Sequence, residues 1–145
     1  MPADLGAFAS PEVQAFASGF PVALLQALAS LAILLGAIAV HSVLSPHKEI
    51  AAIRAGNPAA AISFAGIVLG LAIPLARSLQ ASTSLIETVI WAMAATVLAL
   101  LIFRLVDILL RGLPARVKDG DVSAGALLAS GKVASALIIA AAFSG

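Results

Sequence analysis

The amino-acid sequence predicts an all-α integral membrane protein of four helices, built as a parallel repeat of two helices. Hydrophobic residues make up 62% of the 145 residues and charged residues only 10%, whereas a soluble domain carries about 25% charged residues. Too few polar side chains are present to cover a water-facing surface. Four long apolar runs, and a second half that matches the first, complete the argument.

Each of the four apolar runs is long enough to cross a membrane, because a spanning helix needs about 20 apolar residues. The runs lie at about 21–44, 57–79, 84–111 and 122–143. We therefore expect one membrane domain over residues 21–145. The connections are too short to hold a soluble catalytic domain, so we expect no enzymatic activity, no catalytic residue and no cofactor.

Residues 1–20 precede the first run, and we expect them to lie on the outer face of the membrane with a short interfacial helix. Ser10 is a favourable N-cap and Pro11 suits the first helical position. Phe8 and Phe16 would give this helix an apolar side for the membrane surface. A structural brace is the simplest role for such a segment.

The basic residues gather in two of the three connections between the runs. They are Lys48 and Arg54 in the first connection, and Arg111, Arg116 and Lys118 in the third. The middle connection contains Arg77 alone. The positive-inside rule therefore places the first and third connections in the cytoplasm and both termini outside. The net charge of +1 argues against a nucleic-acid surface.

The two halves of the chain match when one is shifted by 64 positions, so that Gly56-Asn57 falls on Gly120-Asp121. In each pair the glycine permits a tight turn, and the next residue is a good N-cap for the following helix. Because each half has two spans, both enter the membrane in the same direction, with a pseudo-two-fold axis along the membrane normal. The repeat halves are about 21–80 and 84–145.

The two basic corners are candidates for lipid or anion contacts, because each places a helix N-terminus close to cations. The contributing side chains are Lys48, Arg54, Arg116 and Lys118. The alternative is that the corner residues only cap helices and set the topology.

Lys132 is the sharpest candidate for an intramembrane polar site. It lies about ten residues into the fourth run, or ~15 Å deep at ~1.5 Å per residue, where a lysine costs roughly 2.5 to 3.5 kcal/mol. Asp107 is its nearest partner by depth, with Arg104 on the same helix face and His41 at similar depth. These four residues form a hypothetical relay for protons or an anion. The alternatives are snorkelling, one structural ion pair, or pairing with a neighbouring chain.

Small residues recur at four-residue spacing and permit close approach of helices. The glycines concerned are Gly66, Gly70, Gly125 and Gly131. Their faces meet either within one chain or between chains.

Ser135 lies three residues from Lys132, which raises the weak alternative of a serine–lysine hydrolase. The chain has no cysteine, and we expect no metal site.

Residues 47–62, HKEIAAIRAGNPAAAI, carry a family resemblance. With Gly66, Gly70, Pro74 and Trp91, they resemble the domain of unknown function 350 family, the YjfL-like bacterial inner-membrane proteins. The resemblance implies a four-span protein of the bacterial inner membrane, and it supplies no catalytic residues. In such a membrane the outer side, where the positive-inside rule puts both termini, is the periplasm. The second half departs from the pattern, because its corner has an aspartate in place of asparagine and its helix contains Lys132.

Two functions follow as hypotheses. The first is a structural or accessory subunit that acts through helix–helix and lipid contacts, with membrane lipids and a homo-oligomer or a larger membrane complex as partners. The second is a small oligomeric channel or transporter that uses the polar site at Lys132. The short connections and abundant small residues favour the first, whereas the cost of burying Lys132 favours the second.

Overall fold

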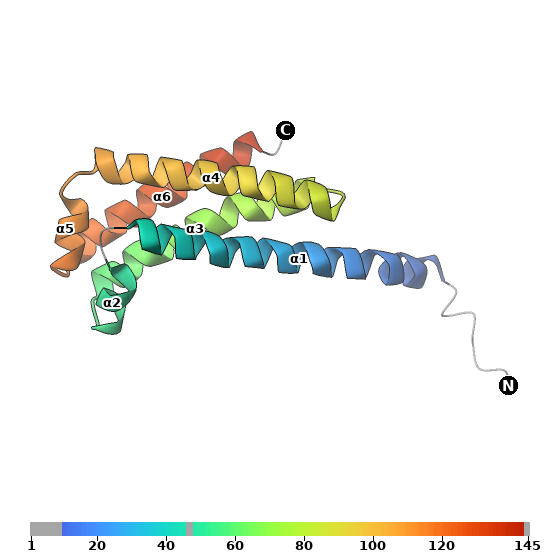
Figure 1. The fold of residues 1–145 in the computed structure, drawn as a ribbon, viewed down its shortest axis with the longest axis horizontal. Helices are drawn as coiled ribbons and strands as arrows, with labels where there is room; N and C mark the ends of the chain where they lie inside the picture. The colour runs from blue at the N-terminus through green and yellow to red at the C-terminus, as the bar shows by residue number, and fades with distance from the viewer. Residues whose placement is uncertain (1–9, 46–47, 144–145) are drawn as a thin grey trace.

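The structure is a computed structural model that describes residues 10–45 and 48–143, and these residues form six helices (Figure 1). Four of the helices are long and apolar enough to cross a membrane: α1 (Pro11–Leu44), α3 (Pro58–Ala81), α4 (Leu85–Leu109) and α6 (Val122–Ala142). Two are short: α2 (Glu49–Arg54) and α5 (Leu113–Lys118). The predicted all-α membrane fold of four spans is confirmed.

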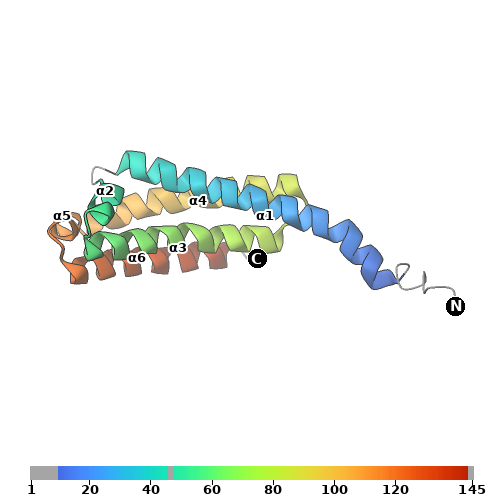
Figure 2. The same cartoon turned by 90° about the horizontal axis from the view of Figure 1, so that it is seen from below.

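The long helices run side by side, with α3 and α6 forming the most extensive helix pair (Figure 2). α1 and α4 pack against each other, and both also contact α3. The short helices α2 and α5 lie together at one end of the bundle, here called the α2/α5 end (Figure 1). This end gathers the basic residues of both corners.

From Gln26 onward the outer surface of α1 is mostly apolar, and the buried polar residues Gln26, Ser30 and His41 face the other helices. The buried residues of α1 are Gln26, Ser30, Ala37 and His41, which form one stripe along the helix. On the opposite side Leu35 is 68% exposed. A soluble helix shows the reverse arrangement, so this pattern is that of a helix with lipid around it.

The structure of α1 differs from the expectation of a separate short helix at the N-terminus. Residues 11–20 are not a separate helix, because α1 runs without a break from the Ser10 cap to Leu44 and contains Pro21. Its 34 residues span about 51 Å at ~1.5 Å per residue, well beyond the ~30 Å of a hydrocarbon core. The first turns therefore project past the other helices (Figure 2). Phe8 lies outside the described residues.

The two corners share one backbone geometry at positions 64 apart. Gly56 and Gly120 have φ of +88° and +86°, where a side chain would be strained. In both corners the glycine N–H donates three residues back and the next residue's N–H donates five residues back. This is a Schellman ending, followed at once by the N-caps Asn57 and Asp121.

Glycines let α3 and α6 approach closely within the chain. A Cβ on Gly66 would lie 2.4 Å from the Cα of Ala129, and one on Gly125 would lie 2.5 Å from the carbonyl oxygen of Ala59. A Cβ on Gly70 would meet the ring of Phe103 at 2.5 Å, while Gly131 faces Val106 more loosely. Of the two arrangements left open by the sequence, contact within one chain is the one observed.

Candidate functional site

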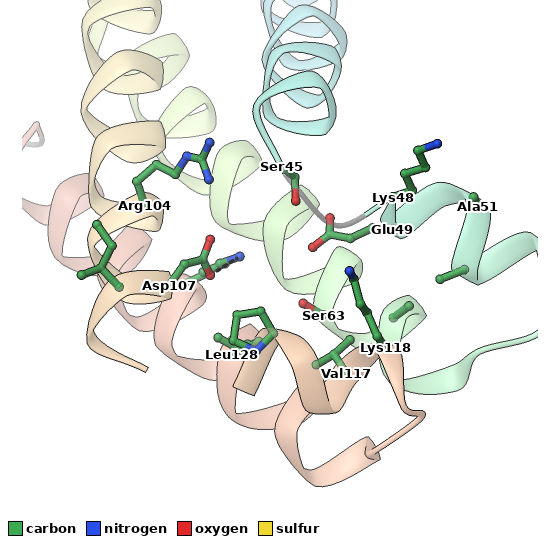
Figure 3. Close-up of a pocket in the computed structure, with 15 residues that line it drawn as sticks. Ser45, Lys48, Glu49, Ala51, Ser63, Arg104, Asp107, Val117, Lys118 and Leu128 are labelled. Carbon is green, nitrogen blue, oxygen red and sulfur yellow. Dashed lines mark ion pairs between the residues drawn. The ribbon is translucent and has the colours of Figure 1, made fainter. Parts of the chain in front are cut away.

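A pocket of about 780 Å³ opens at the α2/α5 end of the bundle. All six helices or their ends contribute residues to it. The end of α1 and the last turns of α4 meet the short helices and the first turns of α3 and α6 here (Figure 3). Its charged lining residues are Lys48, Glu49, Arg104, Asp107, Lys118 and Lys132. Most of the remaining lining is apolar. The pocket thus joins three of the four residues of the predicted intramembrane site to one cation from each predicted corner site.

Lys132 and Asp107 form an ion pair at the inner end of the pocket, with 3.0 Å between Nζ and Oδ1. The lysine side chain is 2% exposed and the aspartate 23%. Lys132 starts ten residues into α6, whereas Asp107 lies in the last turn of α4. The lysine therefore reaches along the bundle toward the α2/α5 end, past the ring of Phe103 at 6.0 Å.

Arg104 has a different role from the one the sequence suggested. Its guanidinium donates a hydrogen bond to the carbonyl oxygen of Leu44, at the end of α1. Among the described residues it makes no ion pair with Asp107, one helical turn away. The arginine joins the end of α1 to α4 and leaves Asp107 to Lys132. Of the residues proposed for the relay, Lys132 and Asp107 pair with each other, and the relay itself stays a prediction.

His41 is also separate from the Lys132–Asp107 pair. Its Nε2 lies 3.7 Å from Oε2 of Glu49 on α2, and neither atom has a hydrogen-bond partner within the described chain. The pair holds α2 beneath the end of α1. Glu49 lines the pocket, but His41 does not.

The four corner cations divide into two pairs. Lys48 and Lys118 line the pocket, and neither makes an ion pair with any of the described residues. In Figure 3 Lys118 extends from α5 toward Glu49 and Ser63, while the ammonium of Lys48 turns outward at the rim. Arg54 and Arg116 lie outside the pocket, and the lipid or anion contacts predicted for the two corners stay predictions.

Arg116 instead pairs with Asp121, the N-cap of α6. Hydrogen bonds from the Ser123 hydroxyl and the Ala124 N–H, together with the Arg116 pair, lower the pKa of Asp121 from 3.8 to about 2. The carboxylate is therefore engaged in capping its helix and in holding the last turn of α5.

Asn57 performs the matching task in the first corner in another way. Its Oδ1 accepts from the N–H of Ala60, while its Nδ2 donates to the carbonyl oxygens of Val117 at 2.8 Å and Lys118 at 3.1 Å. An aspartate would cap α3 but would have no N–H to donate. This contact fixes α5, and with it Lys118, at the mouth of the pocket.

Glu49 and Ser63 are among the polar lining residues that sequence reasoning missed. Glu49 is the only acidic residue in the first corner, which was a usable signal. Ser63 is a buried serine in the second turn of α3. The sequence around it does not distinguish a serine that lines a pocket from one that packs between helices. Ser130 and Ser135 donate to carbonyls of their own helix. In the described ranges no three His, Cys, Asp or Glu side chains cluster as metal ligands.

Comparisons with known proteins agree with this architecture. The profile of the family described as Domain of Unknown Function (DUF350) matches residues 15–143. The chain is also 28% identical over 102 residues to the UPF0719 inner membrane protein YjfL of Escherichia coli K12, covering 70% of this chain and 77% of that protein. The YjfL protein of Escherichia coli O157:H7 matches equally. No solved structure matches the chain.

Proposed function

This chain belongs to the DUF350 family of inner-membrane proteins, and we propose that it binds an anionic ligand in the pocket at the α2/α5 end. The pocket carries the observation that supports this function. Four cations and two carboxylates line it, so the lining has an excess of two positive charges. Lys118 and Lys48 have no counter-ion among the described residues, and a ligand anion would supply one.

The buried ion pair adds a way to hold the anion. An anion that enters beside Asp107 would compete with it for Lys132, and Asp107, being partly exposed, would then turn toward water. A lysine buried without a partner is strongly disfavoured. Lys132 therefore keeps a negative partner in both states, first the carboxylate and then the ligand.

The proposal places the pocket on the cytoplasmic side. The α2/α5 end carries the basic connections, and the positive-inside rule then leaves both termini in the periplasm. The matching corner geometry supports an internal repeat with parallel halves. In this arrangement ligand would enter from the cytoplasm or from the inner leaflet.

Binding fits the structure better than conduction through one chain. A second cavity, of about 330 Å³, lies at the other end of the bundle and is lined by other residues, among them Ser78 and Glu87. An apolar cluster that includes Ile67, Leu71 and Phe103 fills the centre of the bundle between the two ends. A pathway across the membrane would have to open through this cluster or between several copies of the chain.

The predicted role as a structural or accessory subunit, as a homo-oligomer or in a larger complex, stays a second proposal. The lipid-facing apolar surface of α1 permits such contacts, but every spanning helix needs such a surface. The pocket is the more specific feature. Neither proposal includes a chemical step, and neither requires a metal or a cofactor.

Thiol labelling tests the proposed function, because the natural chain has no cysteine. Ser63 and Ser78 are both on α3 and both 1% exposed, but they line the two opposite cavities. We would label Ser63→Cys and Ser78→Cys in oriented membrane vesicles with anionic and cationic methanethiosulfonates. At position 63 the anionic reagent should react faster, and from the cytoplasmic side.

The Ser78→Cys chain is the control for the Ser63→Cys chain. Position 78 should show no preference for the anionic reagent, since Glu87 lines its cavity. Faster reaction of Ser63→Cys with the cationic reagent, or no reaction from either side, would rule out an anion-binding pocket. Reaction only from the periplasmic side would reverse the proposed orientation.

A further inference from the structure

We infer that the ligand is a phosphate carried on an apolar body, such as the headgroup of an anionic phospholipid from the adjoining leaflet. This inference rests on the proposed anion-binding function and adds the chemical class of the ligand. Three properties of the pocket lead to it: its charge, its apolar wall and its position along the bundle.

The charge of the pocket suits a phosphate. The lining has an excess of two positive charges, one of which belongs to Lys48 at the rim. The excess without Lys48 balances a phosphodiester, and the full excess balances a phosphate monoester. Lys132, Lys118 and Arg104 come from three different helices and line the same pocket. Ammonium and guanidinium groups that converge in this way are typical of phosphate recognition.

The apolar wall indicates that more than a free ion is bound. The pocket holds about 780 Å³, a volume typical of sites for organic ligands. Ala60, Val117 and Leu128 are buried and line it. A hydrated inorganic anion gains nothing from this surface, whereas an apolar body buries its own surface against it.

The pocket also reaches the lipid-facing surface. Ile108 on α4 lines the pocket and is 54% exposed, with Leu105 and Leu101 exposed above it on the same helix. The cations follow the bundle from Lys118, outside the spans, to Lys132, within α6. A phosphate held near the surface could thus keep its acyl chains in the bilayer along α4, without removing them from lipid.

The test uses the Ser63→Cys chain in bilayer discs and follows its reaction with a neutral thiol reagent. Discs of phosphatidylcholine alone are compared with discs that contain phosphatidic acid. Two further arms add inorganic phosphate or glycerol 3-phosphate to the phosphatidylcholine discs. Phosphatidic acid should slow the reaction about tenfold, as expected when the ligand is near ten times its dissociation constant, and the soluble phosphates should not. Ser78→Cys in the same discs corrects for general effects of the lipid.

Two charge variants at the α2/α5 end link the protection to the pocket. Lys118→Gln removes a lining cation and should return the reaction rate to within about twofold of the phosphatidylcholine value. Arg54→Gln removes an exposed cation of α2 that lies outside the pocket, and it should keep the protection. Loss of protection in both variants alike would show that only the surface charge of this end of the bundle matters, and this would overturn the inference.

The other outcomes separate this inference from the proposed function. Equal protection by the soluble phosphates would overturn the apolar body and leave an anion pocket in place. No protection by any phosphate, while Ser63→Cys still prefers the anionic reagent, would overturn the phosphate class alone. If that preference is itself absent, the proposed function fails as well.

Discussion

Asn57 donates a hydrogen bond from Nδ2 to the carbonyl oxygen of Val117 at 2.8 Å, and so joins the start of α3 to the end of α5. The two residues are 60 positions apart in the chain. The same side chain caps α3 through Oδ1. One amide therefore serves both halves of the molecule and sets the position of Lys118 at the pocket mouth.

Asn57→Asp should destabilise the protein although it keeps the helix cap. The carboxylate accepts from Ala60 as before, but both donations to α5 are lost and its oxygens face carbonyl oxygens. We expect a loss of about 1 kcal/mol in the free energy of unfolding, the usual net contribution of a hydrogen bond, because one of the two contacts is only partly buried and the other is exposed. Chemical unfolding in detergent micelles measures it. Asp121→Asn, in the matching corner, keeps its cap and should lose less; an equal loss would show that the α3–α5 contact is unimportant.

The Lys132–Asp107 pair should respond unequally to the removal of its two members. Asp107→Asn leaves a lysine that is 2% exposed without its anion, whereas Lys132→Met leaves an aspartate that is 23% exposed and borders the pocket. We expect a loss of about 3 kcal/mol for the first and a smaller loss for the second, since breaking a buried pair costs most where the remaining charge has no access to water.

A double-mutant cycle checks this pair. The Asp107→Asn/Lys132→Met chain should be more stable than the sum of the single losses predicts, because no charge is then left alone. Additive losses would mean that the two side chains act independently. The free energy of unfolding is measured in the same detergent for the natural chain, both single variants and the double variant.

Gly66→Ala should separate α3 from α6. The new Cβ would lie 2.4 Å from the backbone Cα of Ala129, and a backbone atom cannot move aside as a flexible side chain can. We expect a loss of about 1–3 kcal/mol or more, as for other overpacked contacts. Gly36→Ala, which meets nothing within 4 Å, is the matched control and should be close to neutral.

Removing the methyl group of Ala129 should relieve the strain in the Gly66→Ala chain. The Gly66→Ala/Ala129→Gly chain should therefore recover part of the lost stability, because the second substitution removes the Cβ that lies 2.5 Å from the new one. If Gly66→Ala alone is neutral, the close approach of these two helices is not required for the fold.

Asp121 makes part of the stability dependent on acid pH. Its pKa is lowered from 3.8 to about 2, so the folded state binds the proton less readily than the unfolded state does. The stabilisation is complete above pH 3.8 and is lost as the pH falls toward 2. The difference in unfolding midpoint between the natural chain and Asp121→Asn should therefore shrink on acidification over this range. A difference that grows toward low pH would contradict the direction of the shift.

Local features of the sequence determined the spans, the caps and the corners. The lengths of the apolar runs predicted α3, α4 and α6 to within two residues at each end, because burial in lipid depends on the composition of each helix alone. Gly56-Asn57 and Gly120-Asp121 predicted both corners, because a positive φ and a side-chain cap are properties of neighbouring residues. The depth of Lys132 also followed from counting residues along one helix.

Only the tertiary structure decided which side chains meet. Lys132 pairs with Asp107, while Arg104 binds the end of α1 and His41 meets Glu49. These choices depend on how each helix is rotated about its axis and on where the neighbouring helices end, and neither is encoded in one helix. For the same reason only the fold could place Lys118 and Lys132, which lie on different helices, in a single pocket.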